Sequence, residues 1–459
     1  MRHDGCTTAA PGTTSLQTHK IWTGTTGMLD RYFRLTEHGT TVRTELLAGL
    51  TTFLTMAYII FVNPLILTDA GMDHGAVFVA TCLAAAVGTA IMGLYANYPI
   101  ALAPGMGLNA YFTYTVVLTM GYPWQAALGA VFISGVLFLI LSVLPVREAI
   151  INAIPRSLKM ATSAGIGLFL AIIGLKNAGI IQASEATLVT IGDLTQWPPI
   201  LAALGFVATA ALAARRVPGA LIIAILAVSV LGMLLGVSEF QGIVDVPPDP
   251  TPTLFQLDIM AALEIGLITI VFAFLFVDLF DTAGTLIGVS ARAGLLDSEG
   301  RLPRLRQALL ADSSASIAGA CLGTSTTTSY IESAAGINAG GRTGLTAVTV
   351  AGLFLLALFL APLAQSIPGY ATAPALVFVA CLMARGLTEV DWDDATEYAP
   401  ALVTAVSMPL TFSIAHGIAF GFITYAAIKL LSGRIGEARI AVVVLAVLFC
   451  VKFAYLGAA

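Results

Sequence analysis

The chain has 459 residues, of which 58% are hydrophobic and 10% are charged, and its formal net charge is -5. A mean hydropathy of +0.92 lies outside the range of ordinary soluble domains, so the composition excludes a soluble globular protein. A membrane β-barrel would alternate apolar and polar residues in short segments, whereas the apolar runs here are continuous. Because a helix needs about 20 apolar residues to span a bilayer, the sequence predicts an all-α polytopic membrane protein with about 14 spans.

The predicted elements begin with a Thr- and Gly-rich stretch, residues 1–27, which we expect to be a disordered cytoplasmic tail. The first span, 45–66, should end at Asn63-Pro64. Further spans are expected at 76–95, 99–119, 125–144, 158–175, 198–214 and 219–236. A second set follows at 259–290, 305–322, 324–340, 343–365, 371–387, 398–414 and 415–432.

The two sets of seven spans look like copies of each other. Each has a polar-interrupted third span and a tight small-residue joint between its sixth and seventh spans, at Val217-Pro218-Gly219 and at His416-Gly417. Since seven is odd, the copies enter the membrane in opposite orientations, which predicts an inverted repeat. Basic residues cluster at alternate connections, so the N-terminus is expected in the cytoplasm.

Three segments follow from this division of the chain. We assign residues 28–250 to the first repeat and 251–433 to the second. The hydrophobic segment 434–459 lies outside the scheme and is either an added span or a helix in the membrane interface.

Two third spans carry sequences that disfavour a continuous helix. The first reads APGMGLNAYF from Ala103 to Phe112, and its counterpart reads GTSTTTSYIE from Gly323 to Glu332. Irregular backbone at membrane depth persists only where it is buried in protein or lines a cavity. Two breaks at matching positions of inverted halves therefore predict a substrate site, with Asn109 and Glu332 where the half-helices restart.

A third feature is the stretch FLFVDLFDTAGTLIG, residues 274–288. It places Asp278 and Asp281 in an apolar run with no basic residue before Arg292. Carboxylates inside a membrane are costly and are functional by default, and the i, i+3 spacing puts both on one helix face.

Structural readings of the same residues stay open. Ser329 and Glu332 match a capping box, Asn109 is a possible cap, and Asp281 with Thr282 would end a helix. His416 is set aside as structural and the acidic loop 389–397 as a solvated face. Asp312, near the inner end of its span, and Glu264, near the outer end of another, are set aside as residues whose side chains can reach the membrane interface. The sequence shows no nucleotide fingerprint, metal cluster or nucleophile–base pair, which argues against an enzyme, a cofactor, a metal site or a nucleic-acid partner.

At these motifs the sequence resembles a known family. It resembles the AzgA-like purine permeases, relatives of the nucleobase-ascorbate transporters. The resemblance rests on the stretches quoted above and on EHGTTVRTELLAGLTTFLTMAYIIFVNP (37–64), YPIALAPGMGLNAYF (98–112) and GTSTTTSYIESAAGI (323–337). The resemblance covers about residues 32–433.

The resemblance implies a proton-coupled importer of adenine, guanine and hypoxanthine in the cell membrane. It implies a core domain from spans within 45–144 and 259–365, and a gate domain from spans within 158–236 and 371–432. By the same resemblance, the substrate contacts fall on Asn109, Asp278 and Glu332, and the proton is handled by Asp281. We add Gly107 and Thr328, which belong to the two breaks, to the predicted substrate site.

Other functions compete with this hypothesis. The main rival is an anion or sulfate-type permease or exchanger of the same fold, although neither break carries a Lys or Arg to bind an anion. A passive channel would need a continuous polar path, and a membrane enzyme would need paired catalytic groups. The expected partners are a purine base, protons and the lipid bilayer, while the oligomeric state stays open, with a homodimer as one possibility.

Overall fold

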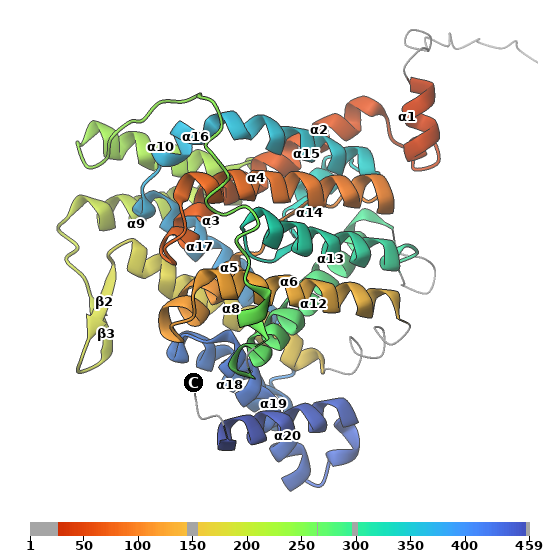
Figure 1. Ribbon diagram of the computed structural model, residues 1–459, viewed down its shortest axis with the longest axis vertical. Coiled ribbons are helices and arrows are strands. Elements are labelled where there is room, and N and C mark those ends of the chain that lie inside the picture. The colour runs from red at the N-terminus through yellow and green to blue at the C-terminus, as the bar shows by residue number, and fades with distance from the viewer. Residues whose placement is uncertain (1–25, 145–154, 264, 296–301, 456–459) are drawn as a thin grey trace, which may run out of the picture.

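The computed structural model of the chain describes residues 26–144, 155–263, 265–295 and 302–455. In this part of the chain the fold is almost entirely helical, and most long helices run across the view of Figure 1. Nine helical segments of the described residues are long and apolar enough to cross a membrane. The prediction of a helical membrane protein is confirmed, whereas the count of 14 spans is not, because several predicted spans consist of shorter pieces.

The elements of the first half come in the following order. They are α1 (Thr26–Phe33), α2 (Val42–Met56), α3 (Ile59–Thr68), α4 (His74–Ile91), η1 (Met92–Ala96), β1 (Leu102–Pro104), α5 (Met106–Ala110), the π-helical η2 (Tyr111–Thr119), α6 (Trp124–Val143), α8 (Arg156–Asn177), β2 (Ile181–Ser184), β3 (Leu188–Ile191), α9 (Trp197–Ala214) and α10 (Ala220–Leu234). Of the predicted tail, residues 1–25 lie outside the described residues, and the last two already belong to α1.

The second half is built in the same way. Its elements are α11 (Ile259–Ala262), α12 (Ile265–Ala293), α13 (Leu305–Leu322), β4 (Thr327–Ser329), α14 (Ser333–Asn338), α15 (Gly344–Ala357), η3 (Leu358–Leu360), α16 (Ala361–Gln365), α17 (Gly369–Ala384), η4 (Arg385–Glu389), α18 (Ala395–Thr411), α19 (Ile414–Leu431), η5 (Ile435–Glu437) and α20 (Ile440–Tyr455).

The first span is interrupted earlier than its sequence predicts. Pro64 lies inside α3, and the interruption falls instead between α2 and α3, at Ala57 and Tyr58. A membrane helix tolerates proline where neighbouring groups use the freed carbonyls. Asn63, which is fully buried, donates through Nδ2 to Thr81 at 2.7 Å and to Thr324 at 2.9 Å, and these bonds tie α3 to α4 and to the second break.

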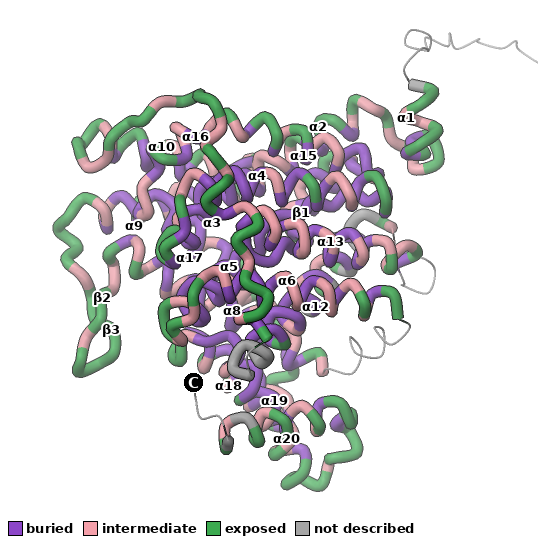
Figure 2. Tube along the Cα trace, viewed as in Figure 1, coloured by how far each residue is buried: buried purple, intermediate pink, exposed green. Residues whose placement is uncertain are grey.

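The two third spans are not purely helical. β1 and β4 pair antiparallel, with Leu102 opposite Ser329 and Pro104 opposite Thr327, so the all-α prediction is wrong at this point. The reason is physical: a three-residue extended segment at membrane depth has no helical hydrogen bonds, and a second such segment is its best partner. Figure 2 shows the buried residues concentrated in this part of the bundle.

The helices pack in two groups that are continuous with each other. One group contains α8, α17, α18 and α19, with α9 and α10 beside α17, and the other contains α2, α4, α6, α13 and α15. Glycines allow close approach in the first group: a Cβ at Gly167 would lie 3.0 Å from the Ala380 carbonyl oxygen, and one at Gly174 would lie 3.0 Å from that of Ala373. The groups contain the predicted gate and core spans, and that division stays a prediction.

The predicted joint at His416-Gly417 is wrong. The chain turns at Phe412 and Ser413, and Ser413 caps α19 by accepting a hydrogen bond from the backbone N–H of His416. Gly417 serves packing instead, since a Cβ there would lie 2.2 Å from Cγ of Met408.

Glu45, on α2, is a buried carboxylate that the sequence analysis did not single out. It accepts hydrogen bonds from the backbone N–H groups of Arg342, Thr343 and Thr346 at 2.9, 3.2 and 3.2 Å, and from the Thr346 hydroxyl at 2.6 Å. A carboxylate at a helix N-terminus satisfies free N–H groups and complements the helix dipole. Its role is therefore to hold α2 against the start of α15.

Candidate functional site

The two breaks form a single unit in which each supplies the other's backbone partners. Beyond the β1–β4 pairing, Gly105 N–H donates to the Thr326 carbonyl at 2.9 Å and Tyr330 N–H donates to the Ala101 carbonyl at 2.9 Å. The Tyr330 hydroxyl donates to the Pro104 carbonyl at 2.6 Å. The segments that the sequence analysis matched by repeat symmetry are thus in direct contact, more than 200 residues apart in the chain.

Asp278 lies on α12 beside this unit and is fully buried. Its Oδ2 is 3.2 Å from the Ser316 hydroxyl oxygen, which is also 2.9 Å from the Thr327 carbonyl oxygen of β4, so both acceptors share the one proton of this hydroxyl. The other oxygen, Oδ1, is 3.5 Å from the Thr282 hydroxyl. All of these partners are neutral.

Asp312, on α13, is a second fully buried carboxylate in the same place. The Thr282 hydroxyl donates to its Oδ2 at 2.8 Å, and the Ser329 hydroxyl donates to its Oδ1 at 2.9 Å. Thr282 therefore lies between the carboxylates of Asp278 and Asp312, and Ser329 connects Asp312 to the second break.

Glu332 lies at the end of the second break, as the N-cap of α14. Its Oε1 accepts from the Tyr58 hydroxyl at 2.7 Å, so the interruption of the first span faces the second break. Asp281 is half-buried on α12, faces the Thr328 side chain and is close enough to Glu332 to interact electrostatically. We call Asp278, Asp281, Asp312 and Glu332 the break carboxylates.

Asn109 belongs to the first break and lies within α5. Its Oδ1 accepts a short hydrogen bond from the Ser325 hydroxyl, while its Nδ2 is buried and has no hydrogen-bond partner among the described residues. A buried amide without a partner is costly, so this N–H₂ group is a ready donor for a bound molecule.

Gly107 and Thr328 were also predicted in the site. A Cβ at Gly107 would lie 2.3 Å from Cγ2 of Ile166, so glycine is what lets the first break approach α8. Thr328 is buried on β4 opposite Ala103. All six predicted residues thus belong to the two breaks or to the adjacent stretch of α12.

The structural readings of these residues are mostly wrong. Ser329 donates to Asp312, and Glu332 makes no side-chain capping bond, so the capping box is not formed. Asn109 lies inside α5, and Asp281 and Thr282 lie in the middle of α12, which continues to Ala293. The side chains are therefore not used as helix caps.

Asp312 is the residue that sequence reasoning missed. It is the eighth of 18 residues in α13 and is fully buried, so it does not reach the membrane interface. A usable signal was present, because Asp312 begins the small-residue run DSSASIAGA, which is typical of a face packed tightly inside a bundle.

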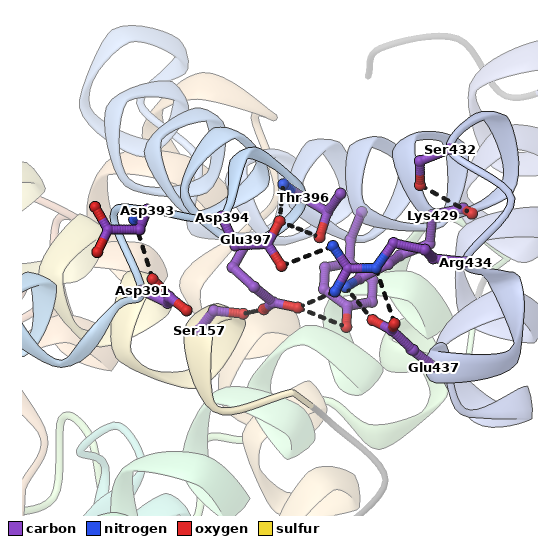
Figure 3. Close-up of polar contacts among 11 residues, drawn as sticks. Ser157, Asp391, Asp393, Asp394, Thr396, Glu397, Lys429, Ser432, Arg434 and Glu437 are labelled. Atoms are coloured by element: carbon purple, nitrogen blue, oxygen red, sulfur yellow. Dashed lines mark hydrogen bonds and ion pairs between the residues drawn. The ribbon is translucent and has the colours of Figure 1, made fainter.

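The acidic loop 389–397 also differs from its prediction. Glu389, Asp391 and Asp393 are exposed. Asp394 and Glu397 are partly buried in an ion-pair network with Lys429, in the last turn of α19, and Arg434, which follows that helix (Figure 3). Lys429 is 1% exposed and contacts Glu397 at 2.9 Å and Glu437 at 2.8 Å. Arg434 contacts Asp394 and Glu437, both at 2.8 Å. We call Asp394, Glu397, Lys429, Arg434 and Glu437 the Lys429 cluster.

A pocket of about 470 Å³ lies between the β2–β3 hairpin and the ends of α8 and α9, and no predicted site residue lines it. In the described part of the chain, no group of three or more His, Cys, Asp or Glu side chains is arranged to hold a metal ion. Glu264, noted in the sequence analysis, lies outside the described residues.

Comparisons with known proteins fit this geometry. The model of the Permease family matches residues 43–452. The chain is 50% identical to the adenine permease AdeP of Escherichia coli over 96% of this chain and 99% of that protein. It is 45% identical to the guanine/hypoxanthine permease PbuO of Bacillus subtilis over 92% and 99%.

Among solved structures, the chain is similar to the transmembrane domain of the cyanobacterial bicarbonate transporter BicA, with a TM-score of 0.64 at 15% identity. The match covers 82% of this chain and 96% of that one, and it concerns the fold alone. The resemblance read from the motifs is confirmed, and the protein is a transporter and not an enzyme. The chain belongs to the Permease family.

Proposed function

We propose that this permease imports purine nucleobases by proton-coupled secondary transport across the cell membrane. One observation carries the proposal: among the described residues, the side-chain hydrogen-bond partners of Asp278, Asp312 and Glu332 are all hydroxyl groups. In the first break, the buried Nδ2 of Asn109 has no hydrogen-bond partner in this part of the chain. The names of the relatives AdeP and PbuO, an adenine and a guanine/hypoxanthine permease, support the substrate class.

The chemistry of a purine suits these groups. A purine base is neutral and planar, with N–H donors and ring-nitrogen acceptors along its edge. Carboxylates of Asp278 and Glu332 accept from the N–H groups, and the free Nδ2 of Asn109 donates to a ring nitrogen or a carbonyl. A site built to satisfy such an edge rejects molecules that lack it, because its buried polar groups are then left without partners.

Proton coupling is assigned to Asp281. It is half-buried and close to Glu332, whereas Asp278 and Asp312 are fully buried. A carboxylate in such surroundings exchanges a proton when water reaches it from one side, and its charge then affects how Glu332 binds the base.

Alternating access is the mode of transport that we propose, and the contacts between the two groups of helices support it. Ile166 of α8 lies against Gly107 of the first break, and the Thr115 hydroxyl of η2 donates to the Phe412 carbonyl at the α18–α19 turn at 2.5 Å. We propose that the breaks move with the core spans against α8 and α18, which opens the site to one side at a time. Clusters of basic residues at alternate connections support a cytoplasmic N-terminus. The homodimer stays a sequence-based prediction.

The rival function is anion transport, to which the fold similarity with a bicarbonate transporter draws attention. The local chemistry disfavours it, because carboxylates face the breaks and the side-chain partners shown there are hydroxyls. An anion beside them would be repelled.

The test is uptake of labelled hypoxanthine in cells that lack their own purine permeases. Unlabelled adenine and guanine should compete, uracil should not, and collapse of the proton gradient should abolish accumulation. Uptake of labelled sulfate or bicarbonate without hypoxanthine uptake would contradict the proposal.

A further inference from the structure

The C-terminal helix α20 is apolar around its whole circumference. From Ile440 to Val451 the sequence IAVVVLAVLFCV contains no charged residue, and Lys452 is the one charge in the helix. A helix that lies flat in the membrane interface needs a strongly polar face opposite its apolar one. Because α20 has no such face, an interfacial position does not suit it.

The contacts of α20 show how it lies against the bundle. Phe449 packs on Phe422 of α19 with ring centroids 6.2 Å apart, and Phe453 packs on Phe420 at 5.4 Å and on His416 at 5.7 Å. As residue numbers rise along α20 they fall along α19, so the two helices are antiparallel. Figure 1 shows α20 beside α19 at one edge of the bundle.

The connection between the two helices is a tight, charged turn. Lys429, near the end of α19, pairs with Glu437 of η5 at 2.8 Å, and Arg434 pairs with the same carboxylate at 2.8 Å (Figure 3). Gly433 has a φ of 75°, a conformation that glycine adopts without strain. The turn is thus built to send the chain back along α19.

The outer side of α20 is a continuous apolar stripe. The exposed fractions are 83% for Ile440, 49% for Val444, 57% for Val447, 57% for Leu448 and 48% for Val451. These positions recur at helical spacing, and Val442 and Ala446 on the opposite side are buried. α19 is itself one of the helices long and apolar enough to cross a membrane, so the stripe runs alongside a span.

We propose that α20 is an additional transmembrane helix, antiparallel to α19, whose exposed stripe contacts lipid acyl chains. Sixteen residues span about 24 Å, against about 30 Å of hydrocarbon, and a bilayer thins locally over a mismatch of this size. It follows that the last turn of α20 lies at the opposite membrane face from the turn at residues 432–437. This inference does not depend on the substrate.

The topology is tested on the full-length protein with its five cysteines replaced by serine. Single cysteines are introduced by Ser432→Cys in the turn and by Ala459→Cys at the C-terminus, and each variant is labelled with a membrane-impermeant maleimide in intact cells and in inverted vesicles. We expect the two cysteines to react from opposite faces. Labelling of both from the same face would overturn the proposal.

A second readout uses the native cysteine background, in case the cysteine-free protein does not fold. An epitope is placed after Ala459 in one variant and after Gly433 in another, and protection from protease is compared in intact cells and inverted vesicles. Opposite protection patterns support the additional span, and identical patterns contradict it.

The lipid contact is tested by matched lysine substitutions. Val447→Lys, at the middle of the stripe, should lower the amount of protein inserted in the membrane several-fold, whereas Ile440→Lys, next to Arg439, should not. Equal decreases in the amount of inserted protein for the two variants would contradict a lipid-facing position of Val447. Efficient disulfide cross-linking between copies through Val447→Cys would show that a second copy covers the stripe, and would also overturn the proposal.

Discussion

Two groups of carboxylates in this protein differ in their partners. The break carboxylates, at the contact between β1 and β4, are held by hydroxyl groups of Tyr58, Thr282, Ser316 and Ser329. The carboxylates of the Lys429 cluster are held by the ammonium of Lys429 and the guanidinium of Arg434. Asp278 and Asp312 are fully buried, whereas Glu437 in the Lys429 cluster is half exposed, so the cation-paired carboxylates lie nearer the surface than the carboxylates without a cation.

The difference separates two roles. A carboxylate paired with a cation has its charge compensated within the protein, and breaking the pair costs stability. A buried carboxylate with only hydroxyl partners remains able to accept hydrogen bonds from a ligand or to take up a proton. Glu45 represents a third arrangement, because backbone N–H groups at the start of α15 satisfy it fully.

The largest expected effect concerns Asp278 and Glu332. Asp278→Asn and Glu332→Gln keep the shape of the side chain but place an N–H₂ group where the base is expected to donate. Uptake of labelled hypoxanthine should fall at least about 100-fold, because a mismatched buried polar contact is penalised strongly. Surface biotinylation or a fluorescent fusion should show normal amounts in the membrane. Near-normal uptake in both variants would remove these residues from the site.

Asp312→Asn should give the next largest effect. The Thr282 hydroxyl donates to Asp312 and is 3.5 Å from Asp278, so loss of the Asp312 charge changes the hydrogen bonding of Asp278 without touching the base. We expect uptake to fall about 10-fold, in line with roughly 1.4 kcal/mol for one such bond. Thr282→Val should produce a similar loss and Thr282→Ser little change. Full activity of Thr282→Val would exclude the connection.

Asp281→Asn should separate binding from accumulation. If Asp281 handles the proton, the variant should bind hypoxanthine with an affinity within about threefold of the native protein but should not concentrate it in cells, because coupling and affinity depend on different groups. Equilibrium binding to purified protein and uptake in energised cells measure the two quantities. Loss of hypoxanthine binding to the purified variant together with normal accumulation of hypoxanthine in cells would contradict this assignment.

Lys429→Met should affect stability and not substrate binding. It leaves Glu397 without its cation while Ser157 and Tyr425 still donate to that carboxylate at 2.5 and 3.3 Å. We expect the free energy of unfolding to fall by roughly 3 kcal/mol, the low end for a broken buried pair because Glu397 and Glu437 are partly exposed, and a thermal melt in detergent detects this loss. The double variant Lys429→Met/Glu397→Gln should recover part of the loss. A lower affinity for hypoxanthine at an unchanged melting temperature would contradict a purely stabilising role for Lys429.

The smallest effect concerns pH. Hydrogen bonds from Arg434 and Lys429 lower the pKa of Glu437 to about 2, and hydrogen bonds from Thr396 with those from Arg434 lower the pKa of Asp394 to about 2. Since both pKa values are below those of the unfolded chain, the stabilisation is complete above about pH 4 to 5 and is lost only as the pH falls toward 2. Melting curves between pH 5 and 8 should therefore show no change attributable to these two groups, and a Glu437→Gln variant should keep the same pH profile in that range.

Much of the site was predictable from sequence because of what membrane burial costs. Asp278, Glu332 and Asn109 stand out as polar residues in apolar segments of the sequence, and the symmetry between the two repeats pairs the first break with the second. Asp312 was not recognised, because sequence alone does not show which side chains of neighbouring helices contact it, and its contact with Thr282 of α12 comes from the fold. The pairing of β1 with β4 was missed for a related reason: a three-residue strand has no periodicity, and its partner is more than 200 residues away.

The Lys429 cluster, at the surface of the bundle, also depends on contacts between distant segments that the sequence does not reveal. Glu397 reads as part of a solvated acidic loop until the fold brings α19 beside α18 and places Lys429 next to it. Pro64 and His416 were misread as helix ends: α3 continues past Pro64 to Thr68, and α19 already begins at Ile414.

The account is tested most directly by comparing Glu332→Gln with Glu397→Gln in purified protein. Both substitutions remove one charge from a buried or half-buried glutamate, and both variants are measured for equilibrium binding of labelled hypoxanthine and for melting temperature. We predict that Glu332→Gln loses binding with little change in melting temperature, and that Glu397→Gln melts at a lower temperature with unchanged binding. The reverse pattern, or equal losses of binding in both, would contradict the division between carboxylates that bind and carboxylates that stabilise.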